Sequence, residues 1–195
     1  MQIEEATTYE VGAGVFADRW LLVLEKVPHV RCERLDAVLT TYDGDYILTV
    51  FGGESLPSMA QNGRVCAIFD GELYSRAGLI KQLDLAPDVS NAGVILRGYQ
   101  EWGSGILKRL RGVFALAIWD GETLLCVRDP LGAFPLFYAI WGGSLLVSTS
   151  VRAFHENAGL PYHPNRLALA DYLLNRWNFK EETFYDDVFR VPSGH

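Results

Sequence analysis

The sequence lacks the excess of positive charge that is typical of nucleic-acid-binding proteins. It also lacks the long hydrophobic runs that are typical of membrane proteins. Its 24 Asp and Glu residues outnumber its 17 Lys and Arg residues, and a net charge of −7 disfavours a general attraction to nucleic acid or anionic lipid. No apolar run approaches the ~20 residues that a membrane-spanning helix needs, and the start of the chain is acidic where a signal peptide is basic. The sequence therefore predicts a soluble, cytoplasmic protein without nucleic-acid or membrane partners.

Cysteine is scarce, and its spacing indicates neither a disulfide framework nor a metal site. Cys32, Cys66 and Cys126 lie far apart, and the last two fall inside apolar runs, where a thiol usually behaves as a small core residue. The histidines also lack the spacing of a helical metal site, so no metal is predicted. They are His29, His155, His163 and His195.

The glycine pattern near the N-terminus gives only weak support for a bound nucleotide. Gly12-x-Gly14-x-x-Ala17 matches a relaxed dinucleotide-binding motif, which requires a helix N-terminus to hold the pyrophosphate. The run from Trp20 to Val27 that follows is instead typical of a strand. A glycine-bearing strand is therefore the favoured interpretation, and no cofactor is predicted for this domain.

What the sequence does contain is the composition of one globular domain, residues 1–195. Of its 195 residues, 49% are hydrophobic and 12% are aromatic, and neither a linker nor an internal repeat divides the chain. Periodicity indicates short strands early and late, with helices between them and in the tail. The predicted strands span 20–27, 46–51, 65–69, 112–119, 123–128, 135–140 and 144–150, and the predicted helices span 72–85, 91–102, 105–110, 151–157 and 164–177.

These elements predict an α+β fold of stacked layers. Antiparallel strand pairs on either side of a helix pair do not follow the alternating order of a parallel α/β sheet. The run from Val113 to Trp119 is continuously apolar, so it requires cover on both faces. Two stacked antiparallel sheets with helices outside them would supply that cover.

The most informative segment runs from Arg128 to Tyr138. A charged pair, Arg128 and Asp129, ends a strand and leads through Gly132 to an aromatic strand that begins at Pro135. Taken alone, these residues predict a turn that is fixed by pairing of Arg128 with Asp129 and by the glycine.

With this segment, the sequence closely resembles the N-terminal glutamine amidotransferase domain of the asparagine synthetase family. Three further stretches carry the same resemblance, in the family's order: Phe69 to Tyr74, Leu110 to Asp120 and Phe189 to His195. The similar segments together cover the chain from Val65 to its end, whereas the earlier residues match poorly.

This resemblance implies an N-terminal-nucleophile hydrolase fold with four layers, αββα, in which two stacked antiparallel sheets are flanked by helices. It also implies a C-terminal synthetase domain beyond His195, which would bind ATP and Mg and activate a carboxylate as its adenylate. The glutaminase reaction of the family uses a cysteine at the start of the mature chain as the nucleophile. An asparagine side chain contributes to its oxyanion hole.

The sequence departs from this chemistry at several positions. Residue 2 is Gln2, the family's first strand would place the nucleophile at about Glu10, and the first cysteine is Cys32. Asp70 replaces the oxyanion-hole asparagine, and an ionised carboxylate would repel an oxyanion. Asn91 replaces an aspartate that holds the substrate amine. No catalytic residue is therefore predicted. The vestigial glutamine pocket would comprise Asp70, Gly71, Glu72, Ser90 and Asn91.

A retained fold without glutaminase chemistry resembles the branch of this family that joins a substrate's own amine to an adenylated carboxylate. The favoured hypothesis is a non-catalytic domain of an ATP-dependent amide ligase, of the lasso-peptide macrocyclase or β-lactam synthetase type. Its partners would be the synthetase domain, covalently joined or split, and the precursor peptide and peptidase of a biosynthetic cluster. Two alternatives stay open: the glutaminase domain of a glutamine-hydrolysing asparagine synthetase whose coding start is misassigned, and a free-standing module that binds a small molecule.

Overall fold

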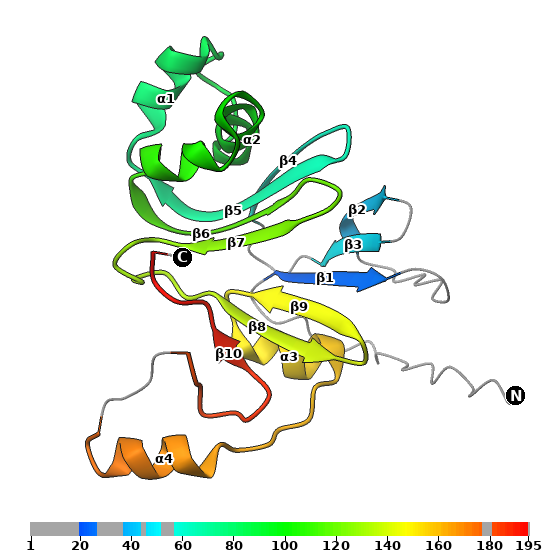
Figure 1. Cartoon of the computed structure of the whole chain (residues 1–195), viewed down its shortest axis with the longest axis vertical. Helices are drawn as coiled ribbons and strands as arrows, with labels where there is room; N and C mark the ends of the chain where they lie inside the picture. Colours follow the sequence, from blue (N-terminus) through cyan, green and yellow to red (C-terminus); the bar gives the residue numbers. More distant parts are fainter. Residues whose placement is uncertain (1–19, 27–36, 44–45, 52–56, 177–180, 195) are drawn as a thin grey trace, which may run out of the picture.

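Two antiparallel β-sheets lie face to face, and helices cover their outer faces (Figure 1). The computed structural model describes residues 20–26, 37–43, 46–51, 57–176 and 181–194. The larger sheet is six-stranded, in the order β10-β8-β9-β1-β3-β2, and the smaller is four-stranded, in the order β4-β5-β6-β7. Neighbouring strands in both sheets run antiparallel.

The strands and helices fall into three groups: the larger sheet, the smaller sheet and the helices. The larger sheet contains β1 (Leu21–Lys26), β2 (Ala37–Asp43), β3 (Tyr46–Phe51), β8 (Phe137–Trp141), β9 (Ser144–Ser148) and β10 (Phe189–Arg190). The smaller sheet contains β4 (Ser58–Asn62), β5 (Val65–Leu73), β6 (Gly112–Trp119) and β7 (Leu124–Arg128). The helices are α1 (Arg76–Leu83), α2 (Asn91–Trp102), the 3₁₀ helix η1 (Gly103–Arg109), α3 (Val151–Ala158) and α4 (Arg166–Leu173).

The alternation of side chains along each strand builds three apolar layers. On β1, Leu21 packs with α3, while Leu22 packs between the two sheets. On β6, Phe114 packs against the layer of α1 and α2, while Ala115 faces the larger sheet. Burial of both faces of β6 explains the continuously apolar run from Val113 to Trp119. The order helix, sheet, sheet, helix confirms the predicted α+β fold of two stacked antiparallel sheets with flanking helices.

The first predicted helix is shorter than its periodicity indicates. The prediction covers residues 72–85, but α1 occupies only Arg76–Leu83 because β5 continues to Leu73. The last residues of β5 pair with the start of β6, and a residue in that ladder cannot also be helical. The sequence pattern also misses β2 and β4, which lie at sheet edges, where strands are often polar.

The predicted start of α2 is confirmed, whereas that of α4 is not. The Ser90 hydroxyl accepts a hydrogen bond from the Gly93 N–H (3.1 Å), which makes it the N-cap of α2. Pro164 does not open α4. Its N-cap is Asn165, whose side chain accepts a hydrogen bond from the Ala168 N–H (2.9 Å).

Several residues singled out in the sequence lie outside the described residues. They are Gln2, Glu10, Gly12, Gly14, Ala17, His29, Cys32 and His195. Among the residues that are described, no helix combines the length and hydropathy needed to cross a bilayer.

Candidate functional site

Asp70 lies on the face of the smaller sheet that is turned toward the larger sheet. It lies on β5 two residues after Ile68, which packs between the sheets, so alternation directs its carboxylate toward the larger sheet. Trp20 Nε1 donates a hydrogen bond to Asp70 Oδ2 (2.9 Å), and Thr149 Oγ1 donates to the same oxygen (3.2 Å). Trp20 immediately precedes β1, and Thr149 immediately follows β9. The carboxylate therefore links the smaller sheet to two neighbouring strands of the larger one.

A serine beside these residues holds the tryptophan backbone in place. Ser148 Oγ donates a hydrogen bond to the Trp20 carbonyl (2.6 Å) and accepts one from the Ser150 N–H (3.1 Å). Trp20 and Ser148 are fully buried, and Thr149 is nearly so. We refer to Trp20, Asp70, Ser148 and Thr149 as the Asp70 cluster.

The donors of the Asp70 cluster determine what its carboxylate can do. An indole N–H is only a donor, so the Asp70 oxygen that it meets is an acceptor. An oxyanion hole needs the opposite arrangement, with donors directed at the position where negative charge develops. The Trp20 indole also fills space beside Asp70 in the apolar layer between the sheets. The cluster therefore joins the two sheets, with Asp70 as the acceptor of both hydrogen bonds.

The two residues after Asp70 play different parts. Gly71 has φ 121°, and a Cβ there would lie 2.2 Å from the Val113 carbonyl oxygen, so only glycine fits. Glu72 lies opposite Val113 in the strand register, and its side chain is exposed. Gly71 is thus required by the close approach of β5 and β6, and Glu72 is available to solvent.

The remaining residues of the predicted pocket lie at the start of α2. The Asn91 Oδ1 atom is buried and has no hydrogen-bond partner among the described residues. The next residue, Ala92, donates its N–H to Ser58 Oγ (3.0 Å), and Ser58 pairs with Phe69 in the sheet. The start of α2 is therefore fixed beside the strand residue that precedes Asp70. The two halves of the predicted pocket thus belong to neighbouring elements, but the Asp70 carboxylate is on the face of β5 toward the larger sheet and α2 packs on the opposite face.

Arg128 lies at the end of β7 and binds three backbone carbonyls. It donates to the carbonyls of Phe134 (2.7 Å), Val191 (3.0 Å) and Gly132. A Cβ on Gly132, which has φ 63°, would lie 2.9 Å from Ser193 Cβ. Arg128 thus holds both its own loop and the last residues of the chain.

Asp129 is completely buried, and its carboxylate binds backbone amides of the same loop. Its carboxylate accepts hydrogen bonds from the N–H groups of Leu131 (3.1 Å), Ala133 (3.1 Å) and Phe134 (2.8 Å). Burial alone would raise the pKa of Asp129, but these amides and the Arg128 charge hold it below its usual value. The pKa of Arg128 is lowered by burial and by Arg190.

The loop from Arg128 to Pro135, which we name the Arg128 loop, is a structural clamp. The sequence predicts that Arg128 and Asp129 fix this turn by pairing with each other, but the hydrogen bonds found for both go to backbone groups. Pro135 is exposed at its end. The two side chains thus hold the turn and the segment at Val191.

Neither described cysteine has the environment of a nucleophile. Cys66 is buried on β5, and burial raises its pKa to about 11. Cys126 lies on β7, and burial raises its pKa to about 12. A thiolate is the reactive form of cysteine, so a raised pKa makes both thiols less reactive near neutral pH.

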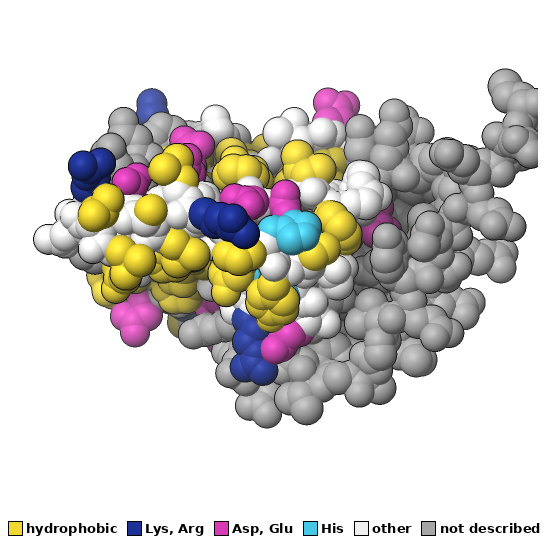
Figure 2. Space-filling view, turned by 90° about the horizontal axis from the view of Figure 1, so that it is seen from below, with side chains coloured by type: hydrophobic (Ala, Val, Ile, Leu, Met, Phe, Trp, Pro, Cys, Tyr) yellow, Lys and Arg dark blue, Asp and Glu magenta, His cyan; other side chains and the backbone are white. Residues whose placement is uncertain are grey.

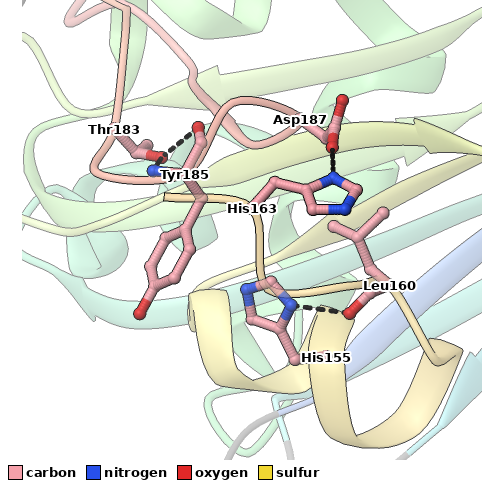
Figure 3. A network of polar contacts seen from close by, with 6 residues as sticks. All are labelled: His155, Leu160, His163, Thr183, Tyr185 and Asp187. Atoms are coloured by element: carbon pink, nitrogen blue, oxygen red, sulfur yellow. Dashed lines mark hydrogen bonds and ion pairs between the residues drawn. The ribbon is translucent and has the colours of Figure 1, made fainter. Parts of the chain in front are cut away.

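The histidines of the C-terminal region make separate contacts (Figure 3). His155 Nδ1 lies 2.8 Å from the Leu160 carbonyl oxygen, and its Nε2 is buried without a described partner. His163 Nδ1 lies 3.1 Å from Asp187 Oδ2 on the surface. The described residues contain no group of three or more His, Cys, Asp or Glu side chains that could hold a metal ion.

Sequence reasoning missed Trp20, Thr149 and Ser58, which build the surroundings of the predicted pocket. Trp20 stands at the start of the first predicted strand, where the sequence pattern indicates only the end of a strand. Its contact with Asp70 spans 50 positions and depends on how the two sheets stack. Periodicity within a segment carries no signal for such a contact.

Comparison with known proteins identifies relatives of this chain. The family described as "Glutamine amidotransferase domain" matches residues 46–195. A putative glutamine-hydrolysing asparagine synthetase of Mycobacterium tuberculosis is 34% identical over 142 residues, which cover 67% of this chain and 22% of that protein. Asparagine synthetase 2 of Bacillus subtilis is 28% identical over 158 residues, which cover 76% of this chain and 21% of that protein.

A solved structure has a similar but distant arrangement. The glutamine phosphoribosylpyrophosphate amidotransferase of B. subtilis, complexed with ADP and GMP, gives a TM-score of 0.45 at 17% identity, covering 70% of this chain and 37% of that chain. The chain spans about a fifth of the length of the curated asparagine synthetases it matches. Because the family match covers the greater part of the sequence, including Asp70, the pocket residues and the Arg128 loop, this chain belongs to the glutamine amidotransferase domain family.

Proposed function

We propose that this chain is a non-catalytic glutamine amidotransferase-like domain of an ATP-dependent amide ligase related to asparagine synthetases. One observation carries the proposal: the indole of Trp20 is hydrogen-bonded to Asp70, at the position where the family resemblance implies an oxyanion-hole asparagine. An ionised carboxylate has no hydrogen to donate to a tetrahedral intermediate, and the buried indole occupies the space beside it.

The two described cysteines also lack the setting that this chemistry requires. Cys66 and Cys126 lie inside strands, where the backbone nitrogen is an amide and cannot serve as the α-amine base. Burial also raises the pKa of both thiols.

The finer assignment is to ligases that join a substrate's own amine to an activated carboxylate, of the lasso-peptide macrocyclase or β-lactam synthetase type. Such enzymes need no ammonia, so loss of the glutaminase would not affect their reaction. In this proposal ATP and Mg bind to the synthetase domain, which is joined to this chain or encoded separately. A cytoplasmic location, a precursor peptide and a peptidase belong to the same hypothesis.

One observation favours a second candidate, a module that binds a small molecule. The buried Asn91 Oδ1 is an acceptor without a described partner, and it lies beside the N-terminus of α2. A ligand with an amine or amide donor would satisfy it. Isothermal titration with glutamine separates the candidates, because a binding module gives saturable heat that Asn91→Leu abolishes, whereas a pure scaffold gives none.

The proposed lack of catalysis is tested by incubating the purified chain with glutamine and measuring glutamate release. The B. subtilis phosphoribosylpyrophosphate amidotransferase serves as the positive control under the same conditions. We expect no release above that of buffer alone. Turnover that is abolished by a thiol-alkylating reagent would contradict the proposal and favour a functional glutaminase with a different chain start.

A further inference from the structure

The last turns of α1 and η1 meet and carry several basic side chains. Lys81 lies in the last turn of α1, and Lys108 and Arg109 lie in the last turn of η1. Arg109 Nη1 donates a hydrogen bond to Gln82 Oε1 (3.2 Å), which joins the two helices. In Figure 1, α1 lies at the opposite end of the molecule from α4. These basic side chains therefore belong to the outer helical layer of the smaller sheet.

Two arginines of this region are held in place by neutral groups. Arg109 stacks over the ring of Trp102, with its Cζ 4.2 Å from the ring centroid. Arg111 Nη1 donates to the carbonyls of Lys108 (2.9 Å) and Leu110 (2.8 Å). The ion pairs found among the described residues include neither arginine. Both guanidinium groups are thus positioned by contacts that leave their charge uncompensated. We name four exposed residues the basic surface: Lys81, Lys108, Arg109 and Arg111.

The positive charge of the basic surface exceeds what the local structure requires. Residues 74–111 contain six Lys and Arg residues and three Asp and Glu residues, although the whole chain has a net charge of −7. The C-terminal end of a helix carries about −0.5 of an elementary charge. Asp84, the C-cap of α1, is the one acidic residue among α1, η1 and their caps. The two helix ends and Asp84 together leave about two positive charges without a counter-charge.

Other basic residues of the chain have acidic neighbours. Arg97 pairs with Glu101 (3.5 Å) and Arg152 pairs with Glu156, each across one turn of its own helix. Figure 2 shows acidic side chains interspersed among the basic ones on the face of the molecule that is seen from below. The excess of positive charge is therefore a local feature of the end where α1 and η1 meet.

We propose that the basic surface binds an acidic segment of another protein and takes up two of its carboxylates. The planar fork of a guanidinium group matches the geometry of a carboxylate. Because Arg109 and Arg111 are already held by Trp102 and by backbone carbonyls, they lose less conformational freedom on binding. The inference does not depend on the proposed function, since the basic surface shares no residue with the Asp70 cluster.

A protein segment fits this surface better than a nucleic acid does. Single-stranded nucleic acids bind by stacking their bases on aromatic side chains, but Trp102 is half-buried and has Arg109 over its ring. A nucleic acid also extends well past four side chains, and its phosphates would meet a chain with a net charge of −7. A short acidic segment places its charges at the basic surface alone.

NMR titration of the isotope-labelled 195-residue chain tests the proposal. The probe is a short peptide of alternating Glu and Gly, and the matching peptide of Gln and Gly is its control. We expect the Glu peptide to shift the amide and Nε–Hε signals of Arg109 and Arg111, and the Gln peptide to leave them unchanged. The absence of these shifts at about 10 mM Glu peptide would overturn the proposal.

Two double variants of equal net charge locate the binding. One combines Arg109→Gln with Arg111→Gln, and the other combines Arg97→Gln with Arg152→Gln, at arginines that have their own carboxylates. The first should weaken binding of the Glu peptide at least about 5-fold, which corresponds to about 1 kcal/mol. The second should weaken it less than about 2-fold. Equal weakening would overturn the proposal, because the effect would then reflect net charge alone.

Lys108→Glu keeps the test decisive if the first double variant unfolds. Lys108 is exposed, and its backbone carbonyl, which accepts from Arg111, is unchanged by the substitution. We expect an unchanged melting temperature and loss of binding to the Glu peptide, and retained binding would overturn the proposal. An oligouridylate that binds more tightly than the Glu peptide, and that Lys108→Glu releases, would assign the surface to nucleic acid and also overturn it.

Discussion

Asp70 lies on β5 of the smaller sheet, and Asp129 directly follows β7 of the same sheet. Different kinds of hydrogen-bond donors hold the two carboxylates. Asp129 accepts hydrogen bonds from backbone amides of its own loop, within five residues of itself. Asp70 accepts from the side chains of Trp20 and Thr149, which belong to the other sheet. Backbone amides are present whatever the sequence, whereas side-chain donors depend on which residues occupy distant positions.

This difference explains where the chain resembles its family and where it departs. The Arg128 loop carries the family motif because its side chains build the turn and hold the end of the domain. Asp70 stands where the family resemblance implies a catalytic asparagine, and here it joins the two sheets instead. Under the proposed function, the Arg128 loop kept its role in folding. Asp70 occupies a position that lost its role in catalysis and now joins the two sheets.

Removing the Asp129 carboxylate should have the largest effect. Asp129→Ala leaves the loop amides without an acceptor and Arg128 without its nearby counter-charge, in a site where Asp129 is fully buried. We expect a loss of about 3–5 kcal/mol in the free energy of unfolding. Urea unfolding followed by tryptophan fluorescence measures it. A loss comparable to that of a surface substitution would show that the loop does not depend on this side chain.

Asp129→Asn is the matched variant, and its stability relative to the wild type should depend on pH. Because the pKa of Asp129 is lower in the folded chain than in the unfolded one, its ionised form stabilises the fold at pH values above the unfolded pKa of about 3.9. That contribution is lost as the pH falls through the folded pKa. Asp129→Asn should be less stable than the wild type at neutral pH, and the difference should shrink on acidification below about pH 4. A difference that is constant from pH 7 to pH 3 would contradict the assignment.

Trp20→Phe should have the next largest effect. The change removes the indole donor from Asp70 and part of the apolar volume between the sheets, where Trp20 is fully buried. We expect a loss of about 1–3 kcal/mol, from an unmade hydrogen bond and a small cavity. Trp102→Phe is the control, since Trp102 is only half-buried and lies in the helical layer. Equal losses for the two variants would contradict a special role for the Asp70 contact.

The sequence predicted the layers of the fold better than the contacts of the site. The run from Val113 to Trp119 reports burial on both faces directly, because each residue's polarity reflects the face it occupies. The edge strand Ser58–Asn62 carries no such pattern, since its side chains are half-buried or exposed. Trp20 meets Asp70 only through the stacking of two sheets, a relation that neither local propensity nor motif spacing encodes.

Asp70→Asn should have the smallest effect, although it restores the residue that the family resemblance implies for catalysis. The new amide oxygen can still accept hydrogen bonds from the Trp20 N–H and the Thr149 hydroxyl. We expect the free energy of unfolding to change by about 1 kcal/mol or less. Glutamate release should remain at the level of buffer, because the buried indole still fills the space beside residue 70. A stable Asp70→Asn variant that hydrolyses glutamine would mean that the carboxylate alone had silenced the domain. The indole would then be compatible with catalysis. The difference between the retained Arg128 loop and the lost active site would come down to the single exchange of asparagine for aspartate at residue 70.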